Sequence, residues 1–121
     1  MRALHEHWVW VAVVSTGIAG LWGLALAVTR RPPRRGFRVA AGIAVSAILL
    51  QVAFGLVLYA DERWRDVVDG FHVFYGIVIL FVLAFAYIFR AQISKRPALW
   101  WGLILLFVMG LGIRAWTIVA A

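Results

Sequence analysis

Four long apolar runs, separated by short polar segments, constrain this chain most strongly. They cover residues 8–28, 37–59, 71–89 and 98–119. A helix needs about 20 apolar residues to cross the roughly 30 Å hydrocarbon core of a bilayer. Of the 121 residues, 65% are hydrophobic and only 14% are charged, whereas about a quarter are charged in soluble domains. The sequence therefore predicts an all-α, polytopic membrane protein in which residues 1–121 form a single domain.

The segments between the runs are short, and several carry helix-boundary signals. Residues 30–36, RRPPRRG, contain adjacent prolines, which cannot continue the hydrogen-bond ladder of a helix. Asp69 is a helix-capping residue type just before the third run, and Pro97 stands at the first turn of the fourth. Because short connections join antiparallel neighbours, we expect an up-down-up-down bundle of four transmembrane helices.

The charged residues divide between alternate connections. All five acidic residues lie at the N-terminus or within residues 61–69. The connections after the first and third runs contain no acid and carry these basic residues: Arg30, Arg31, Arg34, Arg35, Arg38, Arg90, Lys95 and Arg96. The positive-inside rule places these two connections in the cytoplasm and both termini outside a bacterial cytoplasmic membrane. Basic loops of this kind explain the net charge of +7 without a nucleic-acid partner.

One face of the first run carries small residues at helical spacing: Ala12, Thr16, Ala19, Gly20 and Gly23. Small residues allow helices to approach closely in lipid, so this face is expected to pack inside the bundle. Toward the N-terminus the same face continues to His5, whereas His7 aligns with the bulky Val11 and Val14. If the helix extends back past Trp8, His5 points inward and His7 lies nearer the membrane interface.

The other runs pair a polar residue with a glycine one helical turn away. The pairs are Gln51 with Gly55, His72 with Gly76, and Arg114 with Gly110. Residues four apart share a helix face, and a glycine permits a close approach on that face. We therefore expect all three polar side chains to point into the bundle, whereas Gly102, Gly112 and Gly42 are interpreted as packing glycines.

His5 and His72 begin two helices at the predicted outer end of the bundle. Two imidazoles on facing helices are the arrangement that binds a haem iron from both sides, so we predict one b-type haem there. Its propionates would face water, where Arg63, Arg65 or Arg114 would bind them. Aromatic residues near the span ends are interfacial anchors or walls of this pocket: Trp8, Trp10, Phe71, Phe74, Tyr75 and Trp116.

Other interpretations of these polar residues stay open. His72 at a helix start is equally consistent with a solvated residue that binds nothing, and Gln51 suits an interhelical hydrogen bond better than a quinone contact. Arg114 at the outer surface suits snorkelling or an ion pair with Asp69. A zinc or copper site requires a frayed N-terminus, because residues two apart point to opposite helix faces. Its four ligands would be His5, His7, Asp69 and His72.

Three segments together resemble one half of the haem A synthase family. They are EHWVWVAVVSTGIAGLWGLAL at 6–26, LLQVAFGLVLY at 49–59 and FHVFYGIVIL at 71–80, within a resemblance that spans about residues 4–90. The family's acid-and-histidine motif maps onto Glu6 with His5 or His7. Its Gln-x-x-x-Gly and third-helix histidine map onto Gln51, Gly55 and His72. The resemblance implies a four-helix bundle with paired histidines that hold a haem near the outer surface.

The chain also departs from that family pattern. The family typically has Glu-x-x-His followed by arginine, whereas Glu6 here adjoins both histidines and Trp8 follows them. The cysteine pair of many members is absent, and the chain carries one half of the family's tandem. The resemblance therefore implies haem binding more than haem oxidation.

These observations lead to one expected function and one alternative. We expect a small haem protein that transfers electrons or serves as an accessory subunit of a respiratory or photosynthetic membrane complex. The alternative is a cofactor-free structural or assembly subunit whose apolar spans pack against larger membrane partners. A homodimer would also cover such surfaces. No catalytic residues are evident, so whether the chain is an enzyme stays open.

Overall fold

The computed structural model describes residues 2–60 and 70–120, and its regular elements are helices. They are α1 (Arg2–Val28), α2 (Arg35–Ala60), α4 (Gly70–Ile88), the short α5 (Arg90–Ile93) and α6 (Pro97–Ala120). No strand occurs within these two described ranges. Three helices contain stretches long and apolar enough to cross a membrane, at His5–Val28, Arg35–Val57 and Pro97–Thr117. The apolar stretch of α4, His72–Ile88, is shorter. The described part of the chain is therefore all-helical, and the chain has the composition of an integral membrane protein.

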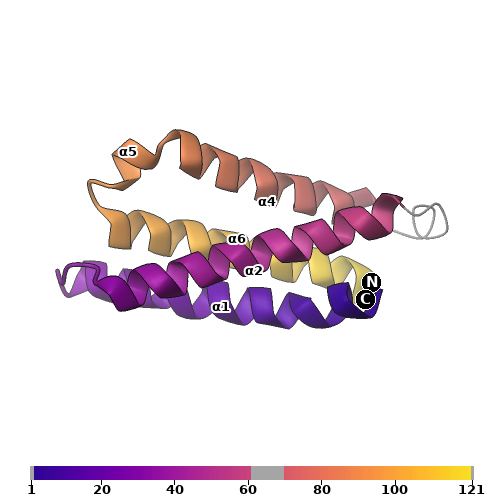
Figure 1. Ribbon diagram of the computed structural model, residues 1–121, viewed down its shortest axis with the longest axis horizontal. Coiled ribbons are helices and arrows are strands. Elements are labelled where there is room, and N and C mark those ends of the chain that lie inside the picture. Colours follow the sequence, from indigo (N-terminus) through magenta and orange to yellow (C-terminus); the bar gives the residue numbers. More distant parts are fainter. Residues whose placement is uncertain (1, 61–69, 121) are drawn as a thin grey trace.

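The four long helices lie side by side and alternate in direction (Figure 1). Both chain termini lie at one end of the molecule, and the α1–α2 turn and α5 lie at the other. α1 packs against α2 and α6, while α4 packs mainly against α6 and makes little contact with α2. Ile79 of α4 nevertheless joins a buried cluster with Ala12 of α1 and Ile48 of α2, so these helices meet in a core at that level.

Small residues bring α1 and α6 into backbone contact, as the stripe on the first run predicted. Ala12, Thr16 and Ala19 are fully buried. A Cβ atom on Gly102 of α6 would lie only 2.9 Å from the backbone nitrogen of Leu24. The opposite face of α1 is exposed, with Leu21 at 63% of its full accessibility. Helical phase thus correctly separated the packing face of α1 from its bulky outer face.

Two helix boundaries differ from those expected from the apolar runs. α1 begins at Arg2, so the helix extends back past Trp8 and includes His5 and His7. This is the condition under which His5 was expected to point inward. An additional element follows the third run, because α5 forms one separate turn between α4 and α6 and buries Ile93. At the α1–α2 connection, Arg30 adopts a left-handed backbone conformation with φ of 56° just before the two prolines.

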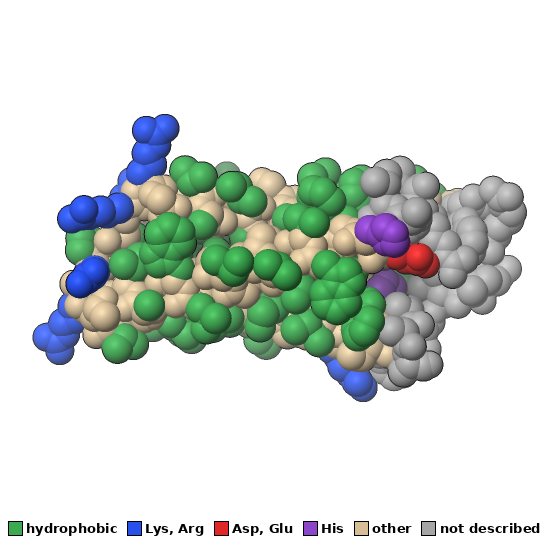
Figure 2. Space-filling view, turned by 90° about the horizontal axis from the view of Figure 1, so that it is seen from below, with side chains coloured by type: hydrophobic (Ala, Val, Ile, Leu, Met, Phe, Trp, Pro, Cys, Tyr) green, Lys and Arg blue, Asp and Glu red, His purple; other side chains and the backbone are tan. Residues whose placement is uncertain are grey.

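The outer surface of the bundle is mostly apolar. Figure 2 shows hydrophobic side chains along its length, with Lys and Arg mostly at one end and His and acidic residues at the other. On α4, Phe81 and Phe85 are 71% and 63% exposed. Exposed apolar area of this extent is unusual on soluble monomers and is expected where a protein faces lipid or a membrane partner.

Candidate functional site

A cavity of about 450 Å³ lies toward the end of the molecule that contains the termini. All four long helices contribute to its walls, which are mostly aliphatic and aromatic. Small-molecule pockets usually have volumes of about 300–1,000 Å³ and apolar walls with a few polar groups. The polar residues and glycines among the lining residues are His5, Glu6, His7, Gln51, Gly55, His72, Gly76 and Gly112.

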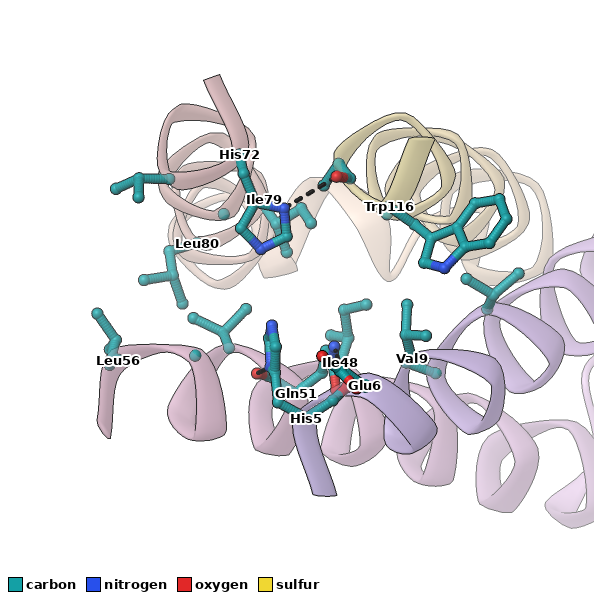
Figure 3. A pocket seen from close by; sticks show the side chains of 18 of the residues that line it. His5, Glu6, Val9, Ile48, Gln51, Leu56, His72, Ile79, Leu80 and Trp116 are labelled. Atoms are coloured by element: carbon teal, nitrogen blue, oxygen red, sulfur yellow. Dashed lines mark hydrogen bonds between the residues drawn. The ribbon is translucent and has the colours of Figure 1, made fainter. Parts of the chain in front are cut away.

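His5 of α1 and His72 of α4 face each other in this cavity. Their ring centroids are 5.8 Å apart, and their ring planes are nearly perpendicular, at 89°. Figure 3 shows His72 extending from α4 toward the side of the cavity where α1 and α2 place His5 and Gln51. The structure therefore brings together two of the histidines that the sequence suggested as partners, although they are 67 residues apart (72 − 5).

Two reciprocal hydrogen bonds hold His5 against α2. His5 Nδ1 lies 3.1 Å from the backbone oxygen of Gln51, and Gln51 Nε2 donates to the backbone oxygen of His5 at 2.9 Å. A Cβ on Gly55 would lie 3.0 Å from Cε1 of the His5 ring. The glycine one turn after Gln51 therefore makes room for this imidazole. Gln51 and Gly55 lie one turn apart on the α2 face toward His5. Both residues of the Gln-x-x-x-Gly motif therefore contact the same histidine.

His72 is held in the same manner by α6. Its Nδ1 lies 2.9 Å from the backbone oxygen of Ala115, the bond drawn in Figure 3. A carbonyl oxygen only accepts hydrogen bonds, so Nδ1 carries the proton in His72 and, by the same reasoning, in His5. In the neutral form of each ring, Nε2 then has an unprotonated lone pair. Metal-binding histidines are commonly oriented by such a bond from the second ring nitrogen.

Gln51 contributes a further polar atom to this region. Its Oε1 is buried and has no hydrogen-bond partner among the residues that the structure describes. Its Nε2 makes the interhelical bond to His5, in line with the interpretation of Gln51 as a contact between helices. The amide therefore satisfies its donor group but not its acceptor.

Gly76 and Gly112 line the cavity on α4 and α6. A Cβ added to Gly76 of α4 would have no heavy atom within 4 Å, so this face of α4 borders open space. Gly112 of α6 also lines the cavity, although the sequence suggested only a packing role for it. The signal that distinguishes it is its spacing of three residues from Ala115, whose carbonyl binds His72.

The inward orientation expected for Arg114 and Gly110 is wrong. Both residues are exposed, and neither belongs to the cavity lining. α6 turns Gly112 and Ala115 toward the cavity, and successive residues on a helix differ by about 100° in direction. Arg114 therefore projects from a different face of α6 than the adjacent Ala115. A glycine one turn away was not sufficient to identify an inward face.

The aromatic residues near the site have separate roles. Trp116 lines the cavity and packs edge-to-face against Trp10, with ring centroids 5.1 Å apart. Trp8 Nε1 donates to the backbone oxygen of Ala47 at 2.8 Å, which adds another bond between α1 and α2. Phe74 and Tyr75 contact each other. Sequence reasoning missed the Trp8 bond, because its acceptor is a backbone carbonyl that no residue type indicates.

A zinc or copper site receives no support from the described residues. Within 2–60 and 70–120, no three His, Cys, Asp or Glu side chains are grouped so that they could hold a metal ion. His7 is exposed at the rim of the cavity. Asp69, Arg63 and Arg65, which the sequence suggested as ligands or propionate partners, lie outside the described residues. Two histidines by themselves suit a metal whose remaining ligands come from its own cofactor.

Comparisons with models of protein families, with curated proteins and with solved structures gave no match. The chemical character of the site follows from its own groups. These are two imidazole rings whose centroids lie 5.8 Å apart, a buried amide oxygen, and mostly apolar walls.

Proposed function

We propose that this chain is a small membrane protein that holds one b-type haem between His5 and His72. The observation that carries the proposal is the paired geometry of the two rings. Metal–imidazole bonds are about 2.0–2.1 Å long, so two such bonds in line place the ring centroids roughly 6 Å apart. The observed separation is 5.8 Å. Each ring also has its Nδ1 bound to a backbone carbonyl, which leaves Nε2 for the iron.

The cavity supports the same group by its shape and polarity. Its walls are mostly apolar, as the face of a porphyrin requires, and Gly76 leaves space beside His72. His5 and His72 would be the axial ligands, while Gly55 and Gln51 keep His5 in place. A bound b-type haem supplies reversible one-electron chemistry. The protein's part is to fix both imidazoles and to keep water from the cavity.

The membrane arrangement proposed is a four-helix, up-down-up-down bundle with both termini outside. Support comes from the alternating helix directions and from the basic residues, which are concentrated at the end opposite the termini. Basic connections are retained on the cytoplasmic side. A reporter that is active only in the cytoplasm, fused after Ala121, should therefore be inactive. An active fusion would contradict the proposed orientation.

The proposed role is electron transfer, or haem binding as an accessory subunit of a respiratory or photosynthetic membrane complex. The resemblance to half of the haem A synthase family supports haem binding, because it maps a histidine pair onto this cavity. The alternative role is that of a cofactor-free structural or assembly subunit, for which the exposed aromatic residues of α4 are the supporting observation. Both roles suit a protein with little mass outside the bilayer.

Absorbance of the purified protein in detergent, after reconstitution with haem, distinguishes these roles. We expect a Soret band and split visible bands in the reduced form, which are typical of low-spin haem with two histidine ligands. His5→Ala and His72→Ala should each abolish the low-spin spectrum, because the iron then loses an axial ligand. His7→Ala is the matched control and should leave the spectrum nearly unchanged, since His7 is exposed at the rim.

Two results would change the assignment in different ways. If His7→Ala abolishes the low-spin spectrum while His5→Ala does not, haem binding stands and the choice of ligand in α1 is wrong. If no preparation shows a Soret band although circular dichroism confirms folded helices, the haem proposal fails. The structural-subunit role would then be favoured.

A further inference from the structure

A second hollow lies on the other side of α4, near α5. This groove runs between α4 and α6, has a volume of about 850 Å³ and is lined almost entirely by apolar side chains. Its aromatic residues recur every four residues, at Phe81 and Phe85 of α4 and at Phe89 just after α4, and Phe107 lines the groove from α6. Phe81, Phe85 and Phe107 are each more than half exposed, so no segment among the described residues covers this groove.

The length of the groove matches one leaflet of a bilayer. Its lining residues run from Val78 of α4 to Phe89, the residue after α4, which corresponds to about 16 Å along a helix axis at 1.5 Å per residue. Half of a hydrocarbon core of about 30 Å is about 15 Å. A partner helix that crossed the whole membrane would need a contact face about twice as long. The groove therefore suits an acyl chain better than a transmembrane helix.

Cationic residues border the end of the groove at α5. Gln92 and Ile93 of α5 belong to the lining, and exposed Arg90, Lys95 and Arg96 lie in or beside the same turn. The guanidinium of Arg90 lies 4.4 Å above the ring of Tyr87 and donates to the Tyr87 carbonyl. A guanidinium has five N–H donors, so this contact leaves others to bind an anion. No acidic residue occurs anywhere from position 70 to the end of the chain.

We propose that this groove binds one anionic phospholipid. The acyl chain lies against the phenylalanine side chains of α4 and α6, and the phosphate lies among Arg90, Lys95 and Arg96. Basic pockets beside transmembrane helices commonly bind anionic head groups in this way. The proposal requires membrane insertion but not haem, so it stands or fails independently of the function proposed above.

Native mass spectrometry of the full chain in detergent tests the head-group contact. The protein is mixed with phosphatidylglycerol or phosphatidylcholine that carry identical acyl chains, and the retained lipid is counted. We expect preferential retention of phosphatidylglycerol, and Arg96→Gln should reduce its affinity about fivefold, which is about 1 kcal/mol for one cation near an anionic head group. The triple variant Arg90→Gln/Lys95→Gln/Arg96→Gln should abolish the preference. Arg31→Gln, which removes the same charge from the α1–α2 connection, should retain it.

A second pair of variants tests the acyl-chain contact. Phe85→Ala should lower retention of both lipids without changing their ratio, because the acyl chains are the same. Phe74→Ala removes an exposed ring of α4 outside the groove and should change neither lipid. Circular dichroism melting in detergent checks that all variants are folded.

Three outcomes would overturn the proposal. The first is equal retention of the two lipids by the unaltered protein. The second is an equal effect of Arg31→Gln and Arg96→Gln, which would indicate diffuse electrostatic attraction. The third is a stable dimer whose cross-links map to Phe85 and Phe107, which would show that a second copy of the chain covers the groove.

Discussion

Replacement of Gln51 by methionine should leave the apoprotein as stable as the unaltered chain, or more stable. The side chain of Gln51 makes one interhelical hydrogen bond, to the backbone oxygen of His5. Such bonds contribute about 0.6 kcal/mol on average in membrane proteins, with a maximum near 1.7 kcal/mol. Methionine is similar in length and removes both polar atoms of the amide.

The same substitution also removes a buried atom that has no partner within the described residues. Oε1 of Gln51 is buried and unpaired there, and an unsatisfied buried polar group costs about 1–3 kcal/mol. The loss of the bond and the relief of this cost oppose each other. We therefore expect the free energy of unfolding of Gln51→Met to be unchanged or up to about 2 kcal/mol higher.

Equilibrium unfolding in mixed micelles, with a rising fraction of denaturing detergent and circular dichroism as the signal, measures this difference. Trp8→Phe is the matched comparison, because it removes another side-chain bond between α1 and α2, from Trp8 to the Ala47 carbonyl. No unpaired atom is removed in that variant, so it should be destabilised by about 1 kcal/mol. Destabilisation of Gln51→Met by more than about 1.7 kcal/mol would refute the reasoning, because a loss beyond a single bond means that Oε1 is paired in solution.

Four glycine substitutions test the cavity and the helix packing. Gly76→Leu should abolish haem binding without destabilising the apoprotein, because its side chain enters open space; Gly110→Leu, also in open space but outside the cavity, should retain haem in the same absorbance assay. Gly55→Leu should abolish the low-spin spectrum, because its side chain would displace the ring of His5; a normal spectrum would contradict the observed contact. Gly102→Ala should lower the free energy of unfolding by about 1–3 kcal/mol, since its Cβ meets the backbone of α1; unchanged stability would show that α1 and α6 can separate.

Local periodicity was sufficient to predict the helices and the packing face of α1. Ala12, Thr16 and Ala19 repeat at helical spacing and are buried, while Leu21 on the opposite face is exposed. The same phase places His5 in the cavity and His7 at its rim. These properties follow from the sequence because the direction of a side chain around a helix depends only on its position along that helix.

The contacts between helices could not be predicted from the residue types alone. The Nδ1 atoms of His5 and His72 bond to the backbone oxygens of Gln51 and Ala115, and every residue has such an oxygen. Which carbonyl lies opposite a histidine is decided by the axial offset and rotation of two packed helices. Arg114 failed as an inward residue for the same reason, since its phase alone did not show which side of α6 faces α4.

The sequence by itself therefore determined an all-helical chain with membrane-spanning composition, because hydrophobicity and helical phase are properties of contiguous residues. Only the tertiary structure decided that α4 packs on α6 and leaves a cavity toward α1 and α2. It also decided that a separate turn, α5, follows the third apolar run and that Gly112, rather than Gly110, borders the cavity. These features depend on how several helices pack against one another. They therefore cannot be predicted from the sequence of any single segment.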